Sequence, residues 1–77
     1  MSGDVATWGE EKDGELQLLQ SPIMEIFKCT CSIARGEDGT CSIKILTMGG
    51  AIFFSQPDME KAKASAERHL RRMNYLL

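Results

Sequence analysis

The sequence lacks the features that characterise membrane and secreted proteins. Its longest uncharged apolar stretch, around residues 45–54, is interrupted by Gly49 and Gly50, and it is far shorter than the roughly 20 residues that span a bilayer. The first 14 residues are acidic and have no apolar centre, which argues against a secretory signal. The three cysteines are an odd number, which favours free thiols in a reducing compartment. We therefore expect a cytoplasmic protein that does not associate with membranes.

Recognisable catalytic motifs are also missing. His69 is the only histidine, and no oxyanion-hole motif accompanies it and the nearby Ser65. Neither of the glycine-rich phosphate-binding patterns, GxxxxGK[ST] and GxGxxG, occurs. Carboxylates pair at residues 10–11 and 37–38, but both stretches are predicted to be exposed, where carboxylates keep ordinary pKa values. We expect a protein that is not an enzyme and binds no cofactor.

The cysteines allow three interpretations. Cys29, Cys31, Cys41 and His69 include the residue types of a Cys3His zinc site. However, Cys-x-Cys on a strand points both thiols to the same side without the knuckle turn that zinc sites use. The favoured interpretation is three small buried hydrophobic residues and no metal, and redox pairing with a partner is the third possibility.

Charge is distributed unevenly along the 77 residues. The net charge is −4 over residues 1–22, zero over residues 23–57 and +2 over residues 58–77. A chain of this length forms one domain, which buries about 60% of the surface of its unfolded form. The overall charge of −2 is unlike the net positive charge of most polyanion-binding domains.

Residues 1–14 are polar and without period, which predicts a flexible acidic tail ahead of a single domain over residues 15–77. Trp8 either docks on the domain or is left for a partner, and docking is favoured because an aromatic ring is costly to leave in water. Residues 15–20 are compatible with a short strand or with one helical turn.

Alternating residues predict a first strand over residues 23–34, with Phe27, Cys29, Cys31 and Ile33 on one side. Residues 36–40, GEDGT, indicate a tight hairpin turn. If Gly36 pairs with Thr40, Ile33 lies opposite Ile43 and Cys31 lies opposite Ile45, which places all four side chains on one face.

A second turn at Gly49 and Gly50 leads to a third strand over residues 51–54, in which either Phe53 or Phe54 points inward. A helix is predicted over residues 57–74, capped by Ser55 with Asp58 three residues later. Its apolar stripe has helical spacing and consists of Met59, Ala62, Ala66, Leu70, Met73 and Leu77. The predicted fold is therefore α+β, a three-stranded antiparallel sheet packed on one C-terminal helix (βββα), with a possible short extra N-terminal element.

Two resemblances bear on function. Residues 61–70, KAKASAERHL, following three strands, resemble the end of a double-stranded RNA-binding domain. That resemblance implies phosphate contacts by Lys61 and Lys63 at the start of the helix. The βββα order and the helix beginning DMEKAKASAERH resemble small phage and prophage proteins, a group that includes anti-CRISPR proteins. This second resemblance implies a non-catalytic inhibitor in a bacterial host cell.

We therefore expect an interaction protein that inhibits a host protein or protein–nucleic-acid complex by stoichiometric binding. The alternatives are a nucleic-acid-binding module of double-stranded-RNA-binding type and a module that homodimerises through the edge of the third strand or the open sheet face. The basic helix residues form either a solvated face or a contact surface. The partner-binding candidates are Lys61, Lys63, Arg68, Arg71, Arg72, Glu37, Asp38 and Trp8.

Overall fold

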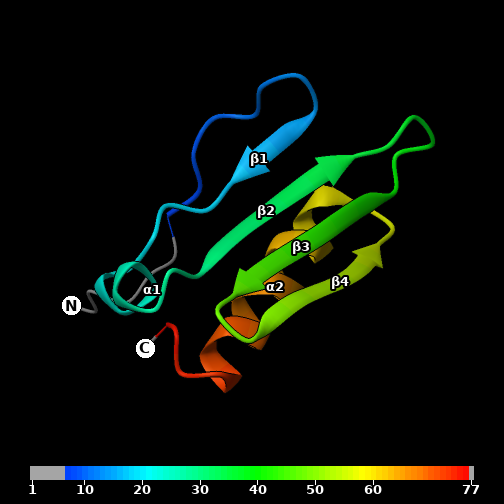
Figure 1. Ribbon diagram of the computed structural model, residues 1–77. Coiled ribbons are helices and arrows are strands. Elements are labelled where there is room, and N and C mark those ends of the chain that lie inside the picture. Colours follow the sequence, from blue (N-terminus) through cyan, green and yellow to red (C-terminus); the bar gives the residue numbers. More distant parts are fainter. Residues whose placement is uncertain (1–6, 77) are drawn as a thin grey trace.

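The computed structural model describes residues 7–76 and arranges them as an antiparallel sheet with a long helix across one face (Figure 1). The elements in chain order are β1 (Glu15–Gln17), α1 (Pro22–Ile26), β2 (Thr30–Arg35), β3 (Cys41–Thr47), β4 (Gly50–Gln56) and α2 (Met59–Arg72). The sheet order is β1-β2-β3-β4. The α+β class and the C-terminal helix are as predicted, but the sheet has four strands rather than three, because residues 15–17 form a strand of their own.

The β2–β3 hairpin has the predicted register. The Gly36 N–H donates to the Thr40 carbonyl at 2.8 Å, and Ile33 and Cys31 lie opposite Ile43 and Ile45. The turn needs a residue with positive φ, which Gly39 supplies at 90°. Local turn chemistry and side-chain alternation agree here, which is why the register could be predicted.

The segment before β2 differs from the prediction of one long strand over residues 23–34. Residues 22–26 instead form α1, whose first turn is capped by the Ser21 hydroxyl accepting from the Met24 N–H at 3.2 Å. Met24 is fully buried, whereas Phe27 is 50% exposed and does not join the sheet. Lys28 then adopts a positive φ of 57°, which reverses the chain before β2 begins.

The strand β4 is longer than the predicted residues 51–54 and follows a tight turn at residues 48–49. Phe54 points toward the core and is half-buried, while Phe53 is 69% exposed on the opposite face. Which phenylalanine points inward was left open by the sequence, and the pairing of Ile43 with Phe54 decides it.

The helix α2 begins two residues later than predicted. Its N-cap is Asp58, whose carboxylate accepts from the Lys61 N–H at 2.8 Å, and the predicted cap, Ser55, belongs to β4. The strand therefore continues past the position where the sequence suggested a helix start. The predicted stripe of Met59, Ala62, Ala66 and Leu70 is buried, while Met73 is the C-cap and Leu77 lies outside the described residues.

The N-terminal segment pairs with the sheet in its described part. Trp8 forms a bridge with Leu18, and the Gly9 N–H donates to the Gln17 carbonyl at 2.8 Å. The predicted tail therefore contributes backbone contacts to the domain from residue 7 onward, and residues 1–6 lie outside the described residues.

The core lies between the sheet and α2. Full burial of an aliphatic side chain contributes about 1.5–3 kcal/mol, and three isoleucines and Leu70 are almost inaccessible. Its buried members are Leu16, Leu18, Met24, Cys29, Cys31, Ile33, Cys41, Ile43, Ile45, Met59, Ala62, Ala66, Leu70 and Leu76. None of the helices described over residues 7–76 is both long and apolar enough to cross a membrane.

Candidate functional site

The helix α2 presents one flank toward β4, and we call it the β4 flank: Lys61, Ser65, Arg68, His69 and Arg72. The Gln56 amide of β4 donates to the Ser65 hydroxyl at 3.2 Å, and the rings of Phe54 and His69 lie 5.6 Å apart. Lys61 and Arg68 line the same shallow hollow as Gln56. Arg72 follows Arg68 by four residues and so lies on the same side of the helix.

The opposite flank of α2 faces the N-terminal segment, and we call it the β1 flank: Lys63, Glu67 and Arg71. The Trp8 indole N–H donates to the Glu67 carboxylate at 2.7 Å. Arg71 approaches that carboxylate to 3.8 Å, and Lys63 lowers the pKa of Glu11 through its charge, after the larger effect of Arg35. The predicted basic cluster is therefore divided between two flanks, and Trp8 is docked as favoured.

The β4 flank carries uncompensated positive charge. Lys61, Arg68 and Arg72 are exposed, and within residues 7–76 none of them makes an ion pair. Two acidic residues precede Lys61 closely: Asp58, whose carboxylate caps the helix, and Glu60, which forms no ion pair with Lys61 within residues 7–76. An anionic group of a partner would therefore meet three cations that have no carboxylate of their own.

The predicted acidic contact residues lie elsewhere. Glu37 and Asp38 occupy the tip of the β2–β3 hairpin, which projects from the sheet in Figure 1. The Asp38 carboxylate accepts from the Thr40 N–H at 3.0 Å, and that bond lowers the pKa of Asp38. Asp38 therefore has a structural role in the turn, and neither residue joins α2 in one surface.

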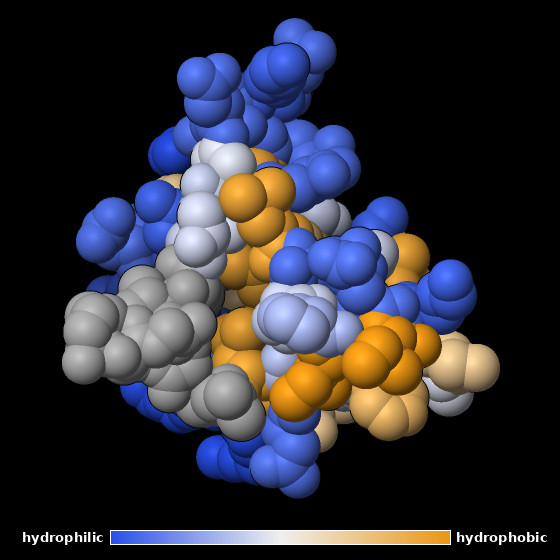
Figure 2. Space-filling model, turned by 90° about the vertical axis from the view of Figure 1, so that its left-hand side faces the viewer, coloured by the Kyte–Doolittle hydropathy of each residue, from blue (hydrophilic) through white to orange (hydrophobic). Residues whose placement is uncertain are grey.

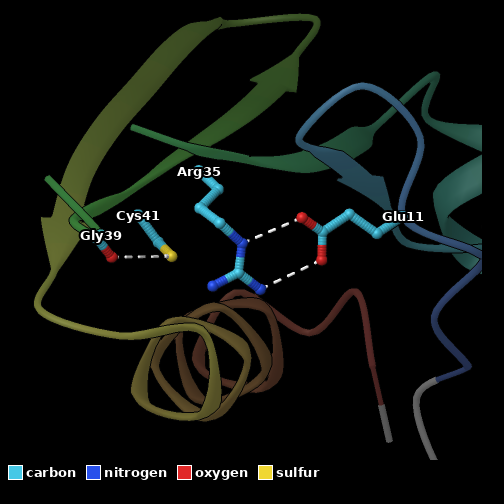
Figure 3. A network of polar contacts seen from close by, with 4 residues as sticks. All are labelled: Glu11, Arg35, Gly39 and Cys41. Carbon is cyan, nitrogen blue, oxygen red and sulfur yellow. Dashed lines mark hydrogen bonds and ion pairs between the residues drawn. The ribbon is translucent and has the colours of Figure 1, made fainter. Parts of the chain in front are cut away.

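An ion pair joins the N-terminal segment to β2 (Figure 3). The Arg35 guanidinium donates to both Glu11 carboxylate oxygens, at 2.9 and 3.0 Å. These bonds lower the pKa of Glu11 and raise that of Arg35. At least one acidic residue of residues 1–22, Glu11, therefore pairs with a cation of the same domain.

All three cysteines are buried and free, as the favoured interpretation predicted. Burial raises the pKa of Cys29, and it raises that of Cys31 to about 12. The Cys41 thiol donates to the Gly39 carbonyl at 3.6 Å. Over residues 7–76, no group of three or more potential metal ligands gathers, and the His69 ring contacts the Phe54 ring.

The strand β4 is an open edge of the sheet. Among the described strands, its one neighbour is β3. The hydrogen bond from the Gly36 N–H to the Thr40 carbonyl shows that residue 40 bonds toward β2. Along an antiparallel strand, successive residues direct their backbone groups to opposite neighbours, so residues 41, 43, 45 and 47 of β3 bond to β4. Their partners are residues 50, 52, 54 and 56. The backbone N–H and C=O groups of Ala51, Phe53 and Ser55 therefore point away from the sheet.

This edge has none of the usual protection against strand addition. Natural edge strands carry lysine, proline or a bulge, or are very short, whereas β4 is seven residues long, GAIFFSQ, without charge or proline. The opposite edge is different, because β1 has three residues and the segment before it covers that edge, with a bridge from Lys12 to Glu15 and another from Trp8 to Leu18, just past the strand. The sequence suggested the third strand's edge as a homodimer contact, but the cationic flank beside it was not recognised.

A second exposed feature is apolar. Ile26 is 70% exposed in α1 and Met48 is 76% exposed in the β3–β4 turn. Figure 2 views the end of the molecule that carries α1 and shows hydrophobic side chains gathered there. Phe27, which follows Ile26 in the chain, is also exposed and packs edge-on against the Tyr75 ring, with the ring centroids 6.1 Å apart.

No known protein family, curated protein or solved structure matches this chain. Its function must therefore be inferred from its own surfaces.

Proposed function

We propose that this chain is a small non-catalytic protein that acts by stoichiometric binding to another protein, and that the open edge of β4 is its contact. The observation that carries the proposal is the row of outward backbone groups on Ala51, Phe53 and Ser55, on a strand with no charge or proline. Peptide segments recognise such an edge by adding a strand to the sheet.

The energetics favour an edge contact. A backbone hydrogen bond contributes about 0.5–1.5 kcal/mol, and three residues with outward N–H and C=O groups offer up to six of them to an added strand. Phe53, 69% exposed, adds apolar area beside the edge. The inhibition of a host complex that the sequence suggested is one form of this action, in which the bound segment is withheld from its normal partner.

The test is a selection of displayed random peptides on the immobilised protein, repeated on two variants. Phe53→Pro removes one outward N–H, and edge positions of this kind tolerate proline. Phe53→Ala removes the same ring and keeps the N–H. We expect selected peptides to bind Phe53→Pro about tenfold more weakly than Phe53→Ala, with both variants shown to be folded by circular dichroism. Equal binding to the two variants, or no enrichment on the unmodified protein, contradicts the proposal.

A second candidate is nucleic-acid binding, favoured by the three cations of the β4 flank that form no ion pair with any residue from 7 to 76. The order α1, β2, β3, β4, α2 also matches the helix, three strands and helix of double-stranded RNA-binding domains. Lys61 and Lys63 are on opposite flanks, however, and α1 has only five residues. If this candidate holds, a 20-base-pair RNA duplex will bind at low salt, and Lys61→Ala will weaken binding more than Lys63→Ala. No mobility shift at low salt would remove it.

A further inference from the structure

We infer that the segment bound by β4 is an extended strand in which acidic and apolar side chains alternate, with the acidic ones on the α2 side of the sheet. This inference rests on the proposed function, because it names the chemistry of the partner at the same edge. Two independent features carry it: the outward backbone groups of β4 and the uncompensated cations of the β4 flank.

The geometry of an added strand places its side chains on two faces. A strand pairs about 4.8 Å from its neighbour, and successive side chains point to opposite faces of the sheet. On one face they lie beside Ala51, Phe53 and Ser55. On the other they lie beside Ile52 and Phe54 and below the β4 flank of α2, since Phe54 contacts His69 and Gln56 contacts Ser65.

The positive charge of the β4 flank determines which side chains of the added strand are favoured on the α2 side of the sheet. Lys61 and Arg68 lie on the rim of the hollow that Gln56 lines, and Arg72 continues this row toward the end of the helix. Carboxylates at alternate positions of the added strand would approach these cations, whereas lysine or arginine there would be repelled. The positive charges are exposed before binding, so complementarity also accelerates association.

On the other face of the sheet, apolar side chains of the added strand are favoured. Phe53 projects from it at 69% exposure, with Lys44 as its cross-strand neighbour on β3. An aliphatic or aromatic residue beside Phe53 forms an apolar cross-strand pair, which stabilises neighbouring strands. The recognised pattern is therefore an acidic residue followed by an apolar residue, repeated two or three times.

A second copy of this chain fits the edge less well. An antiparallel pairing of two β4 strands centred on Phe53 would use the backbone groups of Ala51 and Ser55 and place the two Phe53 rings side by side. It would also bring two β4 flanks toward each other on the same face of the joined sheet, with Arg68 and Arg72 on both sides. Like charges in that position oppose the dimer, and an acidic segment is favoured instead.

Fluorescence polarisation with a synthetic probe tests the inference. The probe is a fluorescein-labelled seven-residue peptide that alternates Glu and Val, and its matched control alternates Lys and Val. A second control carries N-methyl groups on the backbone nitrogens that would face β4. We expect the Glu–Val peptide to bind, and both controls to show no binding up to about 1 mM protein.

Protein variants locate the charge contact. Arg68→Glu combined with Arg72→Glu should weaken binding of the Glu–Val peptide about tenfold or more, because two attractions become repulsions. The matched control, Lys12→Glu combined with Lys28→Glu, makes the same change in net charge just before β1 and β2, away from β4, and should leave affinity within about twofold. Both double variants change the net charge by the same amount, so the comparison isolates the position of the charge.

The outcomes separate the inference from the proposed function. If selected peptides depend on the Phe53 N–H but the Glu–Val and Lys–Val probes bind equally, the inference fails and edge binding stands. If the Glu–Val probe does not bind at all, the inference also fails. A dimer in sedimentation that Phe53→Pro dissociates would assign the edge to a second copy. Binding of a 20-base-pair RNA duplex that Arg68→Glu abolishes would assign the flank to nucleic acid. Either result overturns the inference.

Discussion

The docking of Trp8 on α2 gives a sharp test of whether the N-terminal segment belongs to the domain. The indole N–H donates to the Glu67 carboxylate at 2.7 Å, and the Glu67 side chain is 25% exposed. A hydrogen bond to a charged group contributes about 1.5–3 kcal/mol, and partial exposure to solvent reduces this. We expect a coupling free energy of about 1–2 kcal/mol between the two side chains.

The measurement is a double-mutant cycle with Trp8→Phe and Glu67→Ala, followed by urea unfolding and circular dichroism. Phe retains an aromatic ring and removes the donor, and the lost contact between Glu67 and Arg71 cancels in the cycle. Each kcal/mol lowers the melting temperature by roughly 4–8 °C for a domain of this size.

Two results would refute this reasoning. One is additivity of the two substitutions within about 0.5 kcal/mol. The other concerns the unmodified protein, in which Trp8 is the only tryptophan. Its emission should change in the same transition as the circular dichroism signal, and an emission spectrum of a fully solvated indole before unfolding would show that residue 8 is not docked.

Three further predictions concern stability and thiol reactivity. The Arg35 guanidinium lowers the pKa of Glu11 below its ordinary value of 4.5, so this contribution is complete above that value and is lost as pH falls through the folded-state pKa. Thermal melts between pH 6 and 3 should therefore lose less stability in Arg35→Ala than in the unmodified protein, and parallel curves would contradict this. Gly39→Ala should cost about 1–2 kcal/mol in urea unfolding, because φ is +90° there; unchanged stability would oppose it. Burial raises the pKa of Cys31 to about 12, so a disulfide reagent at pH 8 should modify it only after unfolding, and rapid modification of the native protein would count against its buried position.

The parts of the fold that could be predicted are those in which two local signals agree. The register of the β2–β3 hairpin followed from the turn between Gly36 and Thr40 and from alternation on both strands. The buried stripe of α2 followed from helical spacing. In both cases the element is long enough for its pattern to exclude the alternatives.

Short elements were the source of error. The alternation that includes Phe27 and Cys29 was interpreted as a strand, although Ser21 followed by Pro22 is a helix-start signal. A helix of five residues has low intrinsic stability, so this signal alone does not outweigh the strand-like alternation. The helix α1 is held instead by the burial of Met24 and by the hydrogen bond from the Ser21 hydroxyl to the Tyr75 carbonyl at 2.8 Å. The partner in that bond is 54 residues away, so local sequence could not supply it.

The division of the basic cluster was only partly accessible from sequence. Lys61 and Lys63 are two positions apart, which on a helix turns their side chains about 200° from each other. Spacing alone could thus have separated them. Which flank lies over the open edge depends on how α2 crosses the sheet, and the contacts of Ser65 with Gln56 and of Glu67 with Trp8 decide that.

Amide hydrogen exchange along β4 tests the account most directly, in the free protein and with the Glu–Val peptide. In the free protein we expect slow exchange at Ile52 and Phe54, which bond to β3, and fast exchange at Ala51, Phe53 and Ser55. Addition of the peptide should slow the second set selectively, while the Lys–Val peptide leaves it unchanged. Uniform protection along β4 in the free protein, or protection by both peptides alike, would contradict an open edge that selects acidic strands.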